Sequence, residues 1–230
     1  MPYYELNSKL IGHEPLNGGK MLKPKYRHYV DKTGLFNTDT ELSVVAMSDI
    51  HSMSVEYVTK LVKSKHINKN TIVIMTGDMA GTGRSGAAGD YDPYEMYQYV
   101  LPKCHLLYLV QGNHDIYNSK VNDMVNTDGT HCCVDNSIVN TILGTIGGVN
   151  GIITEEANHE RHKYTEKEYM KKYEYVKRLN PDIMLTHQPV KDDMVFAKLH
   201  LFGHAHAKKH YYEHNGSTCV NMDSRILIMK

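Results

Sequence analysis

An α/β fold is predicted because short apolar runs alternate along the chain with segments of helical periodicity. Five of these runs have the length of buried strands, at 42–47, 71–75, 106–110, 183–185 and 200–202. A polar motif directly follows each of them. Since open α/β sheets gather their functional groups at the carboxyl ends of the strands, the five motifs are expected to meet at one site.

The segments between the strands carry helix signals. Apolar side chains at 55, 58, 61 and 62 share one face of a helix predicted over 54–65. Asp92-Pro93-Tyr94-Glu95 indicates an N-cap, a proline at the first helical position and a capping glutamate, in a helix that runs to about residue 101. Thr165-Glu166-Lys167-Glu168 has the same capping-box form, and Asn180-Pro181 ends the helix that it begins. The stripe of Tyr169, Tyr173 and Val176 on that helix is expected to pack into the core.

Further strands complete the predicted domain. One is expected at 138–143, and the Asn215-Gly216 turn predicts a hairpin that leads into strands at 218–222 and 226–229. Residues 42–230 are predicted as one domain, because a chain of 230 residues that is 41 % apolar can bury an ordinary core. Residues 1–41 are predicted as an N-terminal extension. A hairpin that covers a sheet edge is favoured there over a partly ordered arm beside the substrate.

Composition excludes several classes of protein. Lys plus Arg and Asp plus Glu both number 26, so no global field attracts nucleic acid or membranes. No apolar stretch approaches the roughly 20 residues of a membrane helix, and the segment MPYYELNSKL lacks the apolar region of a signal peptide. The four cysteines show no framework spacing, and Cys132-Cys133 are vicinal. Reduced thiols and a cytoplasmic location are therefore expected, and a structural zinc site is disfavoured.

The five motifs contain the side chains of a two-metal hydrolytic site. They are Asp49-Ile50-His51, Gly77-Asp78, Gly112-Asn113-His114-Asp115, Thr186-His187-Gln188-Pro189 and Gly203-His204-Ala205-His206. Two divalent ions about 3.5–4 Å apart need nitrogen and oxygen ligands and one bridging carboxylate. Any one motif arises by chance in a chain with 15 histidines, but the ordered set, each after an apolar run, does not.

In these motifs the chain resembles the calcineurin-like metallophosphoesterase superfamily, whose pattern is D-x-H, G-D, G-N-H-[DE], H and G-H-x-H in this order. The match runs from 49 to 206, or further to 221. The tail HLFGHAH followed by NGSTCVNMD looks closest to the small phosphodiesterase-like branch, which includes class III cyclic-nucleotide phosphodiesterases. The resemblance implies a four-layer α/β/β/α sandwich and two divalent metal ions.

The resemblance also implies a role for each site residue. One ion would be bound by Asp49, His51, Asp78 and His206. The other would be bound by Asp78, Asn113, His187 and His204. His114 matches the histidine that contacts the phosphate and donates a proton to the leaving group, and Asp115 would orient it. Mn²⁺ is favoured, while Fe, Zn and Ni also suit these ligand types.

One departure from the superfamily concerns the substrate. The serine/threonine phosphatase branch carries G-D-x-x-D-R-G and G-N-H-E, whereas this chain has GDMAGTGR and G-N-H-D. Arg84, in the glycine-rich loop 81–91, either contacts a substrate phosphate or is solvated, and the sequence favours neither. His159 and His162, in a polar loop over 150–163, are expected to be exposed.

The favoured function is a metal-dependent phosphodiesterase that acts on a nucleotide or another small phosphodiester. A phosphomonoesterase or protein phosphatase is the alternative enzyme. A nuclease also fits the superfamily, although the chain lacks a clear basic stripe with interleaved aromatic residues. The alternative outside catalysis is a binding scaffold with a silent site. The sequence does not indicate an oligomeric state.

Overall fold

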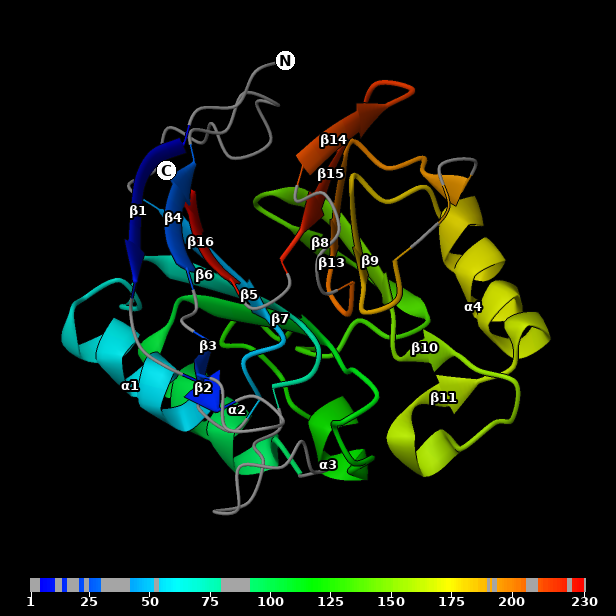
Figure 1. The fold of residues 1–230 in the computed structure, drawn as a ribbon, viewed down its shortest axis with the longest axis horizontal. Helices are drawn as coiled ribbons and strands as arrows, with labels where there is room; N and C mark the ends of the chain where they lie inside the picture. The colour runs from blue at the N-terminus through cyan, green and yellow to red at the C-terminus, as the bar shows by residue number, and fades with distance from the viewer. Residues whose placement is uncertain are drawn as a thin grey trace.

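Two six-stranded sheets form the centre of the structure, which is a computed structural model (Figure 1). It describes residues 5–10, 14–15, 21–22, 25–29, 42–51, 54–79, 92–189, 191, 194–205, 211–222 and 225–229. The mixed α/β class predicted from the sequence is confirmed. The exact four-layer order stays a prediction.

The first sheet has the order β1-β4-β16-β5-β6-β7. Its strands are β1 (Glu5–Leu10), β4 (Lys25–Tyr29), β16 (Arg225–Met229), β5 (Ser43–Ser48), β6 (Thr71–Thr76) and β7 (Leu106–Val110). The adjacent strands β5, β6 and β7 run parallel to one another, so their carboxyl ends lie at the same edge of the sheet. β1 and β4 pair antiparallel and extend this sheet beyond β16, and a small ribbon of β2 (Glu14–Pro15) and β3 (Met21–Leu22) lies between them in sequence.

The second sheet has the order β14-β15-β13-β12-β9-β8. Its strands are β14 (Tyr211–His214), β15 (Ser217–Asn221), β13 (Leu199–Phe202), β12 (Ile183–Thr186), β9 (Gly144–Val149) and β8 (Ser137–Thr141). Neighbours from β15 to β9 are parallel. The predicted hairpin turn at Asn215-Gly216 is present, with both residues in the left-handed region that such turns require.

Three apolar clusters hold the layers together. The cluster between the sheets takes side chains from both, among them Ile72, Tyr108, Ile146, Leu185 and Leu201. A second cluster packs the outer face of the first sheet against α1 (Ser54–Lys63) and α2 (Tyr94–Val100). A third packs the second sheet against α4 (Glu166–Arg178), on the opposite side of the molecule (Figure 1). The strand ends are thereby fixed from both faces.

The remaining elements are short. They are the helix α3 (Ser119–Asn122), the 3₁₀ turns at Leu101–Lys103 and His159–Arg161, and the parallel pair β10 (Ile152–Ile153) and β11 (Lys163–Tyr164). Among the described helices, none is long and apolar enough to cross a membrane. All four cysteines are among the described residues; they are buried, and none of them forms a disulfide.

The helix signals in the sequence had different outcomes. The capping box of α4 is confirmed, since Thr165 and Glu168 cap each other's backbone, and Tyr169, Tyr173 and Val176 are buried. At α2 the prediction was wrong by one residue. Pro93 occupies the N-cap position without a side-chain cap, while Asp92 accepts a hydrogen bond from the Tyr94 N–H.

β9 was not predicted, because the sequence of this strand is rich in glycine. A Cβ at Gly147 would lie 2.7 Å from Val176 Cγ1 of α4, and one at Gly148 would lie 2.5 Å from Val110 Cγ1 of β7. The strand therefore needs glycine so that a helix on one face and the other sheet on the opposite face can approach it closely.

His200, buried in β13, makes stability depend on pH. Burial lowers the pKa of this imidazole to about 3, and its Nε2 lies 2.9 Å from Thr186 Oγ1. In the unfolded chain a histidine has a pKa of about 6.5, so between these values only the unfolded state takes up the proton. The contribution of His200 is complete above pH 6.5 and is lost as the pH falls towards 3.

We therefore expect acid sensitivity that depends on this residue. Between pH 7 and pH 5, the native chain should lose about 2 kcal/mol more of its free energy of unfolding than His200→Gln, because one neutral imidazole is replaced by a group that does not titrate. Urea unfolding at both pH values, with a chelator present, measures the difference. Equal losses in the two proteins would contradict the prediction.

Candidate metal centre

The predicted site residues lie on tight turns directly after the strands. Asp49 follows β5, Asp78 follows β6 and His204 follows β13, and all three have positive φ angles, of 55°, 51° and 61°. Residues other than glycine adopt this left-handed conformation rarely, and it persists only where the surrounding structure imposes it. The turns therefore direct these side chains towards the space at the strand ends.

Two groups of side chains meet there and share one carboxylate. Asp49, His51 and Asp78 form one group, and Asp78, His187 and His204 form the other. Within each group the ligand atoms all lie within 4.8 Å of one another. Two adjacent groups of nitrogen and oxygen donors that share an aspartate are the arrangement that a bridged metal pair requires.

Asp78 and the buried His187 shift each other's pKa. Asp78 is only 1 % exposed, and its Oδ2 lies 3.2 Å from Nε2 of His187. Burial alone would raise the pKa of Asp78, but the imidazolium of His187 beside it lowers that pKa below its ordinary value. The same contact, against the effect of burial, raises the pKa of His187. A divalent ion between them would replace the proton of His187.

Backbone contacts fix the second oxygen of Asp78. Its Oδ1 accepts a hydrogen bond of 2.8 Å from the His114 N–H. The buried Asp115 carboxylate accepts bonds from the N–H groups of Asp78, at 2.9 Å, and Gly112, at 2.8 Å. Asp115 thus joins the loops after β6 and β7, in addition to the orienting role predicted for it.

A second connection joins the two sheets. The His204 N–H donates to both oxygens of Asp49, at 3.2 and 3.0 Å, and Ser48 Oγ donates to Asp49 Oδ2. A Cβ at Gly203 would lie 2.4 Å from Asp49 Oδ2 and closer still to Ser48 Oγ, so only glycine allows the end of β13 to approach the end of β5.

Asn113 provides the test of whether the residues fit a metal ion. Its side chain is 5 % exposed, and its Oδ1 has no hydrogen-bond partner within the described part of the chain. A buried carbonyl oxygen without a partner is costly unless something binds it. Asn113 lies between Gly112 and His114, whose backbones lie against Asp78. A neutral oxygen there suits a divalent ion, and we conclude that the donor set fits one.

The imidazole rings lie close together around this space. The rings of His51 and His114 are 5.3 Å apart between centroids, and those of His187 and His204 are 5.1 Å apart. His187 Nδ1 lies 2.8 Å from the Thr76 carbonyl, which leaves Nε2 directed towards Asp78. A histidine whose second ring nitrogen is held by a carbonyl is a common arrangement in metal sites.

Some predicted site residues are not among those that the structure describes. His206 and Arg84 both lie outside the described residues. Of the two loop histidines, His159 is exposed, as expected, but the expectation for His162 was wrong. His162 is only 2 % exposed, because its left-handed backbone packs against Gly151.

Comparison with known proteins agrees with this geometry. A model of the calcineurin-like phosphoesterase family matches residues 42–218, which include every motif of the site. This chain belongs to the calcineurin-like phosphoesterase family. Members of this family hydrolyse phosphoesters with divalent metal ions, so the family assigns this activity to the chain.

Several solved structures are similar to this phosphoesterase. Phosphopantetheinyl hydrolase from Mycobacterium tuberculosis is 14 % identical, with 81 % of this chain and 90 % of that one covered and a TM-score of 0.49. A hypothetical protein from Thermus thermophilus is 11 % identical, with coverage of 78 % and 75 % and a TM-score of 0.46. A predicted phosphoesterase from Streptococcus pneumoniae is 16 % identical, with coverage of 80 % and 73 % and a TM-score of 0.35. No curated protein matches the sequence.

Proposed function

We propose that this phosphoesterase is a phosphodiesterase with two metal ions, and that its substrates are nucleotides or other small phosphodiesters. The observation that carries the two-ion proposal is the pair of donor groups that share Asp78. A single ion would need only one of these groups. The resemblance of the C-terminal motif to the small phosphodiesterase-like branch supports the substrate class.

The proposed ligands follow from the two donor groups. Asp49, His51, Asp78 and His206 would hold one ion. Asp78, Asn113, His187 and His204 would hold the other. The three ligands of the first ion that are described lie in one donor group. We assign Asn113 to the other because its buried Oδ1 has no partner among the described residues. Mn²⁺ is the proposed metal, and Fe, Zn and Ni fit the same donors.

The chain's own residues carry the remaining steps. Bound divalent ions neutralise phosphate oxygens and lower the pKa of a coordinated water, from about 16 towards 7. Asp78 would be the ligand that the two ions share. His114 donates a proton to the leaving oxygen, which in this type of catalysis contributes on the order of 10²–10⁴-fold. The Asp115 carboxylate fixes the backbone that carries both residues.

We expect a preference for diesters over monoesters. A diester carries one fewer negative charge than a monoester, and only Arg84 is proposed as a cationic contact beside the metals. With Mn²⁺, kcat/KM should be higher for bis-p-nitrophenyl phosphate than for p-nitrophenyl phosphate, and Arg84→Ala should change the diester value only modestly. Arg178→Ala, at the exposed end of α4, is the control. A monoester preference that disappears in Arg84→Ala would favour a phosphatase instead.

A wider set of substrates separates this phosphodiesterase from a nuclease and from a binding scaffold. We would assay turnover with a panel of cyclic nucleotides, dinucleotides, mononucleotides and single-stranded nucleic acid. Cleavage of the nucleic acid would indicate a nuclease, and the other members would reduce the range of candidate substrates. Absence of turnover with every metal would support the binding scaffold. A cytoplasmic location remains part of the proposal, and the burial of all four cysteine thiols without a disulfide supports it.

A further inference from the structure

Asn150, which no motif of the site includes, holds the backbone of the loop that carries Asn113. It lies just after β9 and is 2 % exposed. Its Oδ1 accepts a hydrogen bond of 2.8 Å from the N–H of Gln111, the residue that follows β7. The next residue, Gly151, donates its N–H to the Gln111 carbonyl at 2.7 Å. Both backbone groups of Gln111 are therefore bound by the segment after β9.

The side chain of Gln111 does not help to fix this loop. Both of its polar atoms are buried and have no hydrogen-bond partner among the described residues. The backbone bonds to Asn150 and Gly151 therefore fix where the chain leaves β7. Asn113 lies only two residues further on.

The loop after Gln111 packs closely against the loop after β6 at Gly112. A Cβ at Gly112 would lie closer than 2.5 Å to Asp78 Oδ1 and 2.5 Å from the Asp78 N atom. The loops after β6 and β7 are thus in contact at the shared carboxylate. A small movement of the Gln111 backbone would change the distance between Asn113 and Asp78, and metal ligands tolerate only small displacements.

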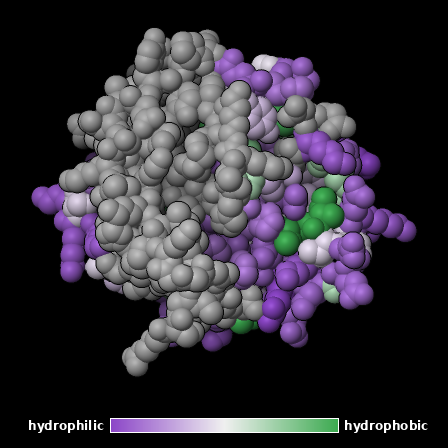
Figure 2. All heavy atoms as spheres, in the orientation of Figure 1, coloured by the Kyte–Doolittle hydropathy of each residue, from purple (hydrophilic) through white to green (hydrophobic). Residues whose placement is uncertain are grey.

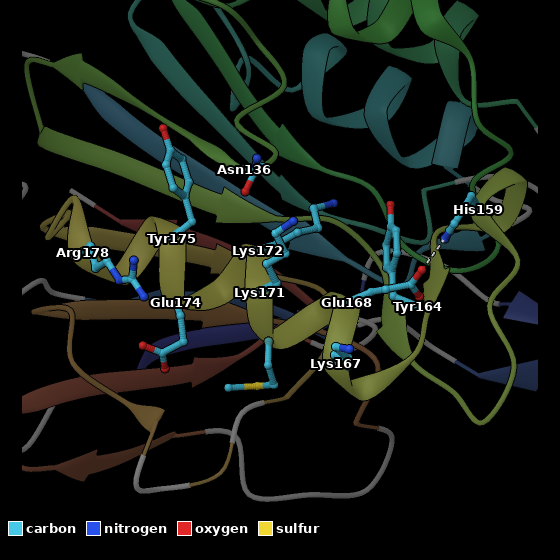
Figure 3. Close-up of a pocket in the computed structure, with 11 residues that line it drawn as sticks. Asn136, His159, Tyr164, Lys167, Glu168, Lys171, Lys172, Glu174, Tyr175 and Arg178 are labelled. Carbon is cyan, nitrogen blue, oxygen red and sulfur yellow. Dashed lines mark hydrogen bonds and ion pairs between the residues drawn. The ribbon is translucent and has the colours of Figure 1, made fainter.

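Asn150 is itself held from α4. Its N–H donates to Asp135 Oδ1 at 2.8 Å, and Asp135 Oδ2 lies 2.8 Å from Lys172 Nζ. Lys172 lies in the middle of α4, with its ammonium group 4.3 Å from the centroid of the Tyr164 ring. Figure 3 shows both side chains on the wall of the cleft beside this helix. Hydrogen bonds and an ion pair thus lead without interruption from α4 to Gln111. On the side where α4 lies in Figure 1, Figure 2 shows a largely hydrophilic surface around a small apolar patch.

We propose that Asn150 is a positioning residue for the metal centre. It sets the place of Asn113, and Asp135 and Lys172 hold Asn150 in turn. This inference rests on the proposed function, because it requires that Asn113 binds an ion. It assigns no contact with substrate to Asn150, so its effect should appear in metal affinity before any reaction occurs.

The test compares two buried asparagines that hold the same strand. Asn126 accepts a 2.7 Å bond from the Leu107 N–H and donates a 3.0 Å bond to the Leu107 carbonyl, at the other end of β7 from the metal loop. Asn150→Ala and Asn126→Ala should both lower the melting temperature of the metal-free protein. Only Asn150→Ala should weaken Mn²⁺ binding. We expect its affinity to fall by about 10-fold or more at one metal site, the same site at which Asn113→Ala lowers the affinity. Calorimetric titration of the metal-free proteins with Mn²⁺ measures this.

A second pair of variants serves if Asn150→Ala does not fold. Lys172→Met breaks the pair with Asp135, while Lys171→Met removes the neighbouring exposed cation. Lys172→Met should lower the Mn²⁺ affinity of the same site, by less than Asn150→Ala does. Lys171→Met should leave this affinity unchanged. Native affinity in both Asn150→Ala and Lys172→Met, or an equal loss in Asn126→Ala, would overturn the inference. A native chain that binds no metal would overturn the proposed function instead.

Discussion

Asp78→Asn is expected to lose both metal ions and nearly all turnover while the chain stays folded. The carboxylate belongs to both donor groups, so replacing it by an amide weakens both at once. The fold should survive, because the amide oxygen can still accept the bond from the His114 N–H. The change removes only the charge and one of the two anionic oxygens, which are what a bridging ligand needs.

Metal content and circular dichroism check this expectation together. Plasma emission analysis should find two ions per native chain and close to none in the variant, with unchanged far-ultraviolet spectra. Asp123→Asn, at an exposed position beside α3, is the matched control and should behave as the native chain does. Two ions per chain and native rates in Asp78→Asn would show that Asp78 does not bridge.

His114→Ala is expected to keep both ions and to lose on the order of 10²-fold or more in kcat on substrates with poor leaving groups. Its neighbour Asn113 is the proposed ligand, and adjacent residues on one turn seldom reach the same ion. The ring of His114 packs edge-on against that of His51, a proposed metal ligand, so His114 lies beside the proposed metal site. Removing a proton donor matters most when the leaving group is a strong base.

Substrates with different leaving groups separate this role from a general loss of structure. A p-nitrophenyl ester needs little protonation, so its rate should fall much less than that of an alkyl ester. His105→Ala, at an exposed position just before β7, should leave both rates unchanged. Equal losses on the two substrates would remove the proton-donor role, and a missing ion would mean that His114 is a ligand.

The strand-end motifs could be predicted because the chemistry of the ligands and the strands that carry them are both local features of the sequence. Asp49, Asp78 and His204 each follow directly on a strand whose apolar residues mark it. The burial of His162 could not be predicted, because it depends on a left-handed turn that packs against Gly151, a contact between two separate loops. β9 was missed because close packing requires glycines where strand propensity favours branched side chains. Asn150 gave no signal, since it acts on the backbone of Gln111, and no sequence pattern records which backbone group a side chain will reach.

The donor set crosses the boundary between the two sheets, since Asp49, His51 and Asp78 follow strands of the first sheet and His187 and His204 follow strands of the second. Such a centre is a late product of folding. β16 (Arg225–Met229) pairs with β5 inside the first sheet, so even that half is incomplete until residue 229 has been synthesised. Tight metal binding must therefore wait until the two halves have docked. Metal bound by the proposed ligands would join the two sheets, and its removal should increase hydrogen exchange at both sets of strand ends together.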